Sequence, residues 1–187
     1  MRELSLHILD VIENAVEAGA SRIRVEINED PESDRLTIGI DDNGKGMGPD
    51  LIREVLNPFC TTRKTRHVGL GLPLCSEAAR RCDGALTIDS APGKGTRVRV
   101  TFRHSHIDRA PLGDVPSALL AVLLSERPVD IHYLHRVGKR EFLFDTAEVR
   151  EALDGISLAH PKVRDWIFQQ LQEGEESLHS QETQSGS

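Results

Sequence analysis

The chain carries, at residues 35 to 47, the stretch RLTIGIDDNGKGM. Its first part alternates Leu36, Ile38 and Ile40 with other residues, and this period of two predicts a β-strand with one buried face. At the end of that strand, residues 42 to 46 place an aspartate beside two alternate glycines. Glycines there allow backbone conformations and a close ligand approach that side chains would block. An Asn-Gly turn without any ligand has the same local sequence, so this segment alone leaves both readings open.

On either side of this stretch, the spacing of hydrophobic residues changes several times between that of a helix and that of a strand. We expect helices at 4–18, 49–56 and about 69–82, and strands at 22–27, 35–40, 85–90 and 96–103. This order predicts an α+β fold, a two-layer α/β sandwich whose mixed, mostly antiparallel sheet is covered by helices on one face. Farther on we expect a helix at 117–125, a hairpin of 130–133 with 141–144, and helices at 146–153 and 161–172.

A composition shift near residues 108 to 116 suggests where the chain divides. We expect a first domain at 1–107 and a small C-terminal α/β appendage at 108–173. The apolar stripes of the appendage indicate packing rather than a ligand site, either against the first domain or against a partner protein. The last segment, 174–187, is rich in Ser, Gln and Glu, and this composition predicts disorder.

The bulk composition limits the classes of partner. Formal net charge is -7, from 30 acidic and 23 basic residues, which argues against nucleic acid or an anionic membrane surface as the main partner. No apolar run is long enough to span a bilayer and the start lacks a signal-peptide core, so we expect a cytoplasmic protein. Cys60, Cys75 and Cys82 form no CxxC pair and are predicted to be reduced and buried. His104 and His106 have no third ligand at metal-binding spacing, so no metal site is expected there.

The first predicted helix carries two polar residues on one face. Asp10 and Asn14 are four apart, so both side chains point the same way. An asparagine oxygen is a hard ligand that suits Mg²⁺, and a carboxylate one turn away could hold or deprotonate a water beside the metal. The alternative is an amphipathic helix with two polar residues at its edge.

A second glycine pair, Gly69-Leu70-Gly71, opens the helix that follows a basic loop. Free amides and the positive end of the helix dipole favour a phosphate at such a position. Arg63, Lys64 and Arg66 add positive charge on a loop that could close over a triphosphate. Each of these features also occurs without a ligand, as a solvated loop before a helix.

Five motifs in order carry a family resemblance: Glu13-Asn14-Ala15, DNGxG at 42–46, NPFxTT at 57–62, GLGL at 69–72 and GKGT at 93–96. Over residues 4–103 the chain resembles the GHKL family, the ATP-binding fold of DNA gyrase, the large heat-shock chaperone, mismatch-repair ATPases and sensor histidine kinases. The resemblance implies an α/β sandwich with ATP between helices and sheet, beneath a mobile lid.

The resemblance also implies roles for single residues. Asn14 would ligate Mg²⁺, and Asp42 would accept a hydrogen bond from the adenine amino group. Gly44 and Gly46 would line the base pocket, and Thr96 would support it. The other implied nucleotide contacts are the phosphate-binding Gly69 and Gly71, the lid residue Lys64 within 61–67, and their neighbours Met47, Leu70 and Leu72.

Two positions depart from the family pattern. Members that hydrolyse ATP usually carry glutamate four residues before the asparagine, whereas this chain has Asp10, one methylene shorter. The shorter reach puts the hydrolysis rate in doubt but not the binding of nucleotide. Only nine residues precede Asp10, so we expect a stand-alone member, like anti-sigma-type kinases, without the histidine-bearing hairpin of sensor kinases. His7 is read mainly as a packed residue that orients Asp10, and alternatively as a phosphoacceptor.

The sequence therefore favours a Mg-ATP-binding, histidine-kinase-like enzyme that transfers the γ-phosphoryl group to a partner protein or to water, with Asp10 as base. The alternative is a non-catalytic switch that responds to ATP and regulates a protein partner. The sequence leaves the oligomeric state and the identity of the partner open.

Overall fold

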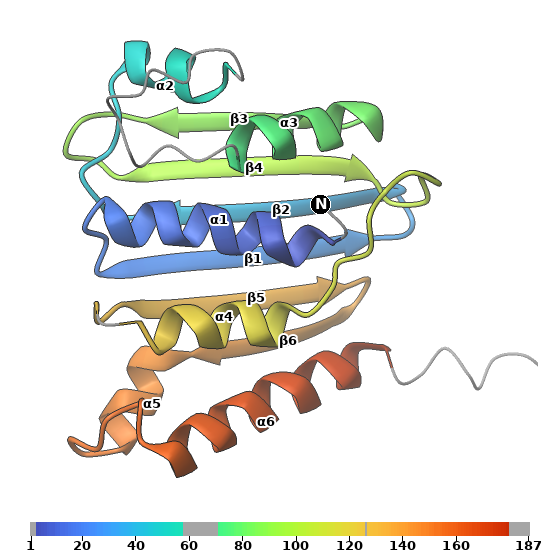
Figure 1. Ribbon diagram of the computed structural model, residues 1–187. Helices are drawn as coiled ribbons and strands as arrows, with labels where there is room; N and C mark the ends of the chain where they lie inside the picture. Colours follow the sequence, from blue (N-terminus) through green and yellow to red (C-terminus); the bar gives the residue numbers. More distant parts are fainter. Residues whose placement is uncertain (1–2, 58–70, 126, 180–187) are drawn as a thin grey trace, which may run out of the picture.

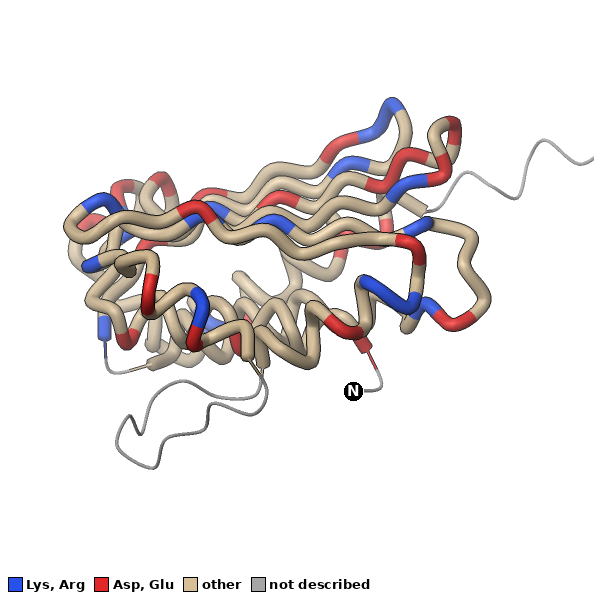
Figure 2. The backbone as a smooth tube through the Cα atoms, turned by 90° about the horizontal axis from the view of Figure 1, so that it is seen from above, with Lys and Arg blue, Asp and Glu red and all other residues tan. Residues whose placement is uncertain are grey.

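The computed structural model describes residues 3–57, 71–125 and 127–179. The elements in them are α1 (Leu4–Glu17), β1 (Arg22–Asp30), β2 (Arg35–Asp42), α2 (Pro49–Val55), α3 (Gly71–Arg81), β3 (Ala85–Ser90), β4 (Thr96–Arg103), α4 (Val115–Leu123), β5 (Asp130–Val137), β6 (Arg140–Asp145), α5 (Thr146–Ala152) and α6 (Pro161–His179). Within these residues six strands form one mixed sheet in the order β3-β4-β2-β1-β5-β6, with β1 and β5 parallel. The predicted α+β sandwich is confirmed, because the helices lie on one face of this sheet (Figures 1 and 2).

The alternation along the strands divides the sheet into a buried and a bare face. Ile23, Val25 and Ile27 of β1 are at most 1% exposed and pack beneath α1. The residues between them are charged or polar, and the alternation of burial assigns them to the other face of the sheet. No helix of the described residues covers that face (Figure 2). On that face Arg97 of β4 donates to Asp41 of β2 at 2.8 Å. Charge pairing between neighbouring strands suits a face in contact with water.

The C-terminal part extends the same sheet. Strand β5 pairs in parallel with β1 from Arg22↔Asp130 to Glu29↔Val137, and β6 pairs with β5 as the edge strand. The predicted hairpin is therefore present, with longer strands than the sequence indicated. The proposed boundary between residues 107 and 108 separates strands that share one sheet.

The predicted disorder from Gly174 onward is wrong for its first six residues, because α6 continues to His179. A Cβ at Gly174 would lie 2.2 Å from the ring of Phe142, so this glycine lets the helix approach β6 closely. Leu178, one turn later, is 1% exposed. Gly174 is thus an internal packing position and not the end of a helix.

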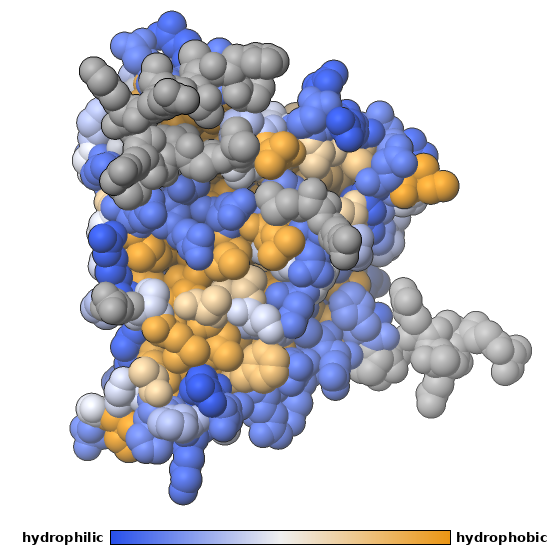
Figure 3. Space-filling model, viewed as in Figure 1, coloured by the Kyte–Doolittle hydropathy of each residue, from blue (hydrophilic) through white to orange (hydrophobic). Residues whose placement is uncertain are grey.

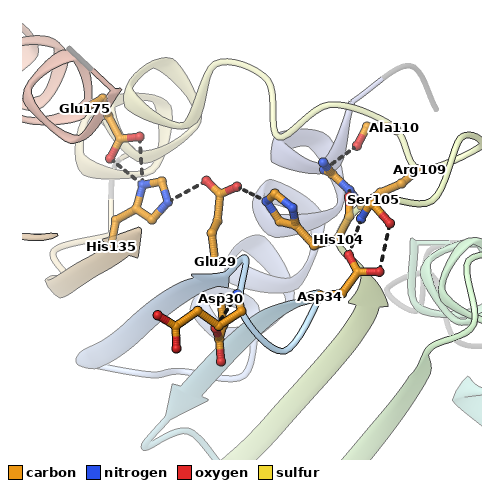
Figure 4. Close-up of polar contacts among 10 residues, drawn as sticks. Glu29, Asp30, Asp34, His104, Ser105, Arg109, Ala110, His135 and Glu175 are labelled. Carbon is orange, nitrogen blue, oxygen red and sulfur yellow. Dashed lines mark hydrogen bonds and ion pairs between the residues drawn. The ribbon is translucent and has the colours of Figure 1, made fainter. Parts of the chain in front are cut away.

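A buried histidine links α6 to the sheet (Figure 4). His135 of β5 is fully buried; its Nδ1 lies 2.9 Å from Glu175 Oε2 and its Nε2 lies 3.1 Å from Glu29 Oε1. Tyr133 donates to Glu175 at 2.7 Å, and His104 Nε2 lies 2.8 Å from Glu29. Burial alone would lower the pKa of His135, but hydrogen bonds and charges from Glu175 and Glu29 raise it to about 9. Burial likewise opposes ionisation of Glu29, yet its two histidine partners lower its pKa to about 2.

Cys75 and Cys82 are buried and free, as predicted, and burial raises the pKa of the Cys75 thiol to about 12. Cys60, the loop 61–67 and Gly69-Leu70 lie outside the described residues. None of the helices in the described part of the chain has the length and apolar character that crossing a bilayer requires.

The His135 network makes stability depend on pH. The folded-state pKa of His135 is raised above the unfolded value, so its contribution is complete below about pH 6.5 and is lost as the pH rises through about 9. At pH 6 we expect His135→Gln to lower the free energy of unfolding by about 3 kcal/mol, since it removes the buried cation that the two carboxylates share. Urea denaturation from pH 6 to pH 10 measures both the loss and its decrease.

The matched control is His104→Gln, because His104 bonds to the same Glu29 but is partly exposed. This substitution should lower the free energy of unfolding much less than His135→Gln does at pH 6, whatever the pH. A loss in His135→Gln that stays constant between pH 6 and pH 10 would show that packing, and not charge, holds this contact.

Candidate functional site

The carboxylate at the end of β2 has a fixed position. Asp42 Oδ1 accepts from the Gly44 amide at 2.7 Å, and the space at Gly44 is tight, since a Cβ would lie 3.0 Å from the Ala18 carbonyl oxygen. Burial raises the pKa of Asp42, while the amides of Gly44 and Thr96 act in the opposite direction. An ionised carboxylate accepts several hydrogen bonds, so Asp42 retains capacity for a ligand donor such as an amino group.

The two glycine turns pack backbone against backbone. Gly46 has φ +67°, and a Cβ there would lie 2.0 Å from the carbonyl oxygen of Ala91. Gly95 has φ +76°, and its Cβ would lie 1.9 Å from the carbonyl oxygen of Asp42. The contact between these turns therefore requires both glycines. The predicted contact of Gly46 with the base stays a prediction.

Ser90 joins these turns and was not predicted. Its hydroxyl accepts from the Met47 amide at 2.8 Å and donates to the Gly95 carbonyl at 2.7 Å. The Thr96 hydroxyl lies 3.0 Å from it. A signal was available, because Ser90 follows Leu86 and Ile88 in the alternation of β3 and so places a hydroxyl at an inward position. Asp42, Ser90 and Thr96 line an open hollow of about 190 Å³ at the end of the sheet, which Asp41 and Arg97 of the bare face also line.

A second unpredicted residue, Asn43, ties the turn after β2 to the beginning of β1. Its Oδ1 accepts from the amides of Ser21 and Arg22, each at 2.9 Å, and its Nδ2 donates to the Ser21 hydroxyl. The Lys45 amide donates to the Ala18 carbonyl, just beyond α1, at 3.0 Å. These bonds fix the carboxylate of Asp42 relative to the end of α1.

The other end of the site lies where α1 meets the first residue of α3. A Cβ on Gly71 would lie 2.8 Å from Asp10 Oδ2, so a larger residue there would force the Asp10 side chain to shift. Burial raises the pKa of Asp10, and the neighbouring His7 counteracts this effect. His7 is 6% exposed, which suits the packed, orienting role better than that of a phosphoacceptor. The structure therefore places a carboxylate against the amino end of α3.

The remaining predicted contacts divide into three groups. Asn14 is half-buried on α1, four residues after Asp10. Leu72 is 5% exposed and Met47 partly buried, and both pack with the core. The predicted contacts Lys64, Gly69 and Leu70 lie outside the described residues, so their roles stay predictions.

A model of the family described as histidine kinase-, DNA gyrase B- and HSP90-like ATPase matches residues 2–106. The chain belongs to this family. It is thus an ATP-binding, histidine-kinase-like protein over that range. The segment that forms α4, β5, β6, α5 and α6 lies beyond the matched residues.

Several curated proteins are similar over about half of the chain. Sporulation kinase C of Bacillus subtilis (strain 168) is 32% identical, with 54% of this chain and 23% of the kinase covered. Sensor histidine kinase YxdK of the same organism is 33% identical, with 53% and 32% covered. The chain thus spans less than a third of one relative and about a third of the other.

A solved structure gives independent support for the fold. The N-terminal domain of a DNA repair protein superposes with a TM-score of 0.50 at 15% identity, covering 76% of this chain and 52% of that one. This similarity concerns the fold alone.

The glycine contacts predict a sharp difference between two substitutions. Gly46→Ala should lower the free energy of unfolding by more than about 3 kcal/mol, because positive φ and a backbone collision act together. Gly93→Ala is the matched control: its φ is +74°, but nothing lies within 4 Å of its Cβ, so it should cost only about 1 kcal/mol. Urea denaturation measures both, and equal losses would contradict the proposed contact.

Proposed function

We propose that this protein binds Mg-ATP and transfers the γ-phosphoryl group to a partner protein or to water. One observation carries the proposal: Asp10 lies against Gly71, the first residue of α3, while Asn14 follows one turn later on the same helix. A carboxylate thus meets the amino end of a helix, with an amide side chain one turn away on α1. This combination suits a metal ion and an anionic phosphate chain.

Asn14 would hold Mg²⁺, since its amide oxygen is a hard ligand, and the bound ion would neutralise charge on the phosphates. The free amides at the start of α3 would bind the phosphates, with Gly71 and the predicted Gly69 as contacts. Asp10 would act as base toward the attacking hydroxyl or water. Its raised pKa supports this role, because a base works best with a pKa near the operating pH.

The adenine end would lie at the strand termini. Asp42 would accept from the adenine amino group, and Thr96, held by Ser90, would support the base. The proposal also includes a protein phosphoacceptor and a cytoplasmic location. The similarity to a sporulation kinase and a sensor histidine kinase supports an acceptor of the protein class.

One observation favours a second function, a non-catalytic switch. Asp10 occupies the position at which hydrolysing members carry the longer glutamate, and its carboxylate is packed against Gly71. A carboxylate that does not reach the attacking group could leave nucleotide binding intact while ATP turnover stays slow. Nucleotide binding would then act through a change of conformation that a partner recognises.

The adenine assignment can be tested with neighbouring aspartates. Asp42→Asn should weaken ATP binding at least about tenfold, because an amide cannot replace an acceptor-only carboxylate toward the base. Asp41→Asn is the control, since Asp41 pairs with Arg97 on the bare face of the sheet. Calorimetry measures both affinities. Equal affinity of Asp42→Asn and the parent protein would refute the assignment.

The catalytic assignment can be tested with γ-labelled ATP and Mg²⁺, following free phosphate and protein-bound label together. Asp10→Asn keeps the shape beside Gly71, so binding should stay within about twofold while turnover falls about 100-fold. Unchanged turnover would remove Asp10 from the mechanism. Binding by the parent protein without either product would support the switch.

A further inference from the structure

The helix that carries Asp10 and Asn14 has its first amides satisfied from outside. The residue before α1, Glu3, makes no side-chain capping bond. Instead the Leu4 amide donates to the Pro111 carbonyl at 2.9 Å and the Ser5 amide donates to the Leu112 carbonyl at 2.7 Å. Amides at a helix start have no partner within the helix, so these two bonds replace an N-cap.

The same segment of the chain reaches the other end of α1. Arg127 donates from Nη1 to the Val16 carbonyl at 3.3 Å, in the last turn of the helix. The carbonyl groups at a helix end carry partial negative charge, so a guanidinium there is favourable. Asn14, the proposed Mg²⁺ ligand, lies in this same turn.

Between these contacts the chain runs beside α1 as helix α4 (Figure 1). Val115, Leu119 and Val122 are at most 3% exposed and pack into the core. Asp114 caps the start of α4, accepting from the Ser117 amide at 2.9 Å. Figure 3 shows an apolar area over α4 that reaches the edge of α1. We call residues 111–125 with Arg127 the α4 segment; it is a packed unit that contacts both ends of α1.

We propose that Arg127 is a positioning residue for the Mg²⁺ site and that the α4 segment sets the placement of α1 against α3. The proposal rests on the proposed function, since it needs Asn14 as a metal ligand. Asn14 and Asp10 act only if their helix stands at the right distance from the amino end of α3. The α4 segment lies beyond the residues that the family model matches, so the proposed control comes from outside the matched range.

The test uses calorimetry to measure ATP binding at increasing concentrations of Mg²⁺. The affinity for adenosine is measured in the same way without metal. Arg127→Gln should raise the Mg²⁺ concentration at half-maximal binding about fivefold, as expected for loss of a cation at a helix end. Adenosine affinity should change much less, because Asn43 also ties the turn that carries Asp42 to the start of β1. Arg127→Lys should restore most of the Mg²⁺ response.

Arg164→Gln is the matched control, since Arg164 is a surface arginine of α6 that pairs with Asp165. An unaltered Mg²⁺ response in Arg127→Gln would overturn the inference, as would an equal loss of adenosine binding, which would indicate general loosening. A parent protein without Mg²⁺-dependent ATP binding would refute the proposed function itself, and the inference with it. That failure appears before any substitution is made, so the two are distinguishable.

Discussion

The site depends first on a contact between two peptide backbones. Gly46 and Gly95 each come so close to a carbonyl of the facing turn that a Cβ would collide with it. This contact joins the ends of β2 and β4, whose register already pairs Asp42 with Thr96. A carboxylate and a hydroxyl are thereby held side by side without a ligand. Glycine here stabilises the scaffold of the site as well as leaving room for what binds.

Hydrogen bonds connect this pair of turns to α1. Asn43 and Lys45 connect the turn after β2 to the residues that follow the helix, and Gly71 closes against Asp10 from the other side. The C-terminal part acts on the same helix, because β5 pairs with β1 along its length and α4 lies beside α1. Residues beyond the family range thus help to place groups within it. The Glu29–His135–Glu175 contact then fixes α6 to this enlarged sheet.

The sequence predicts those features that depend on neighbours along the chain. The alternation in β1, β2 and β4 and the helical spacing in α1 place these elements to within a few residues. Prediction fails where a residue acts through a distant partner. His135 is a polar residue at a buried position of β5. Its partners, the carboxylates of Glu29 and Glu175, lie 106 and 40 residues away in the chain. Gly174 has the local signature of a helix end, and only the ring of Phe142 explains its place inside α6.

The same distinction holds within the site. Asp10, Asp42 and the glycines were predicted because their motifs are contiguous in the sequence. The contacts of Ser90 depend on the register of β3 with β4, and those of Asn43 depend on the pairing of β2 with β1. Electrostatics then connects the predicted residues. A nucleotide with its base at Asp42 would bring its phosphates toward the Asp10 carboxylate, in a chain of net charge -7. The attraction must come from the amino end of α3, from the predicted lid cations and from Mg²⁺. Because Asp10 occupies the space beside Gly71, the metal ion would have to offset this repulsion, which makes the position of Asn14 decisive for the affinity of the triphosphate.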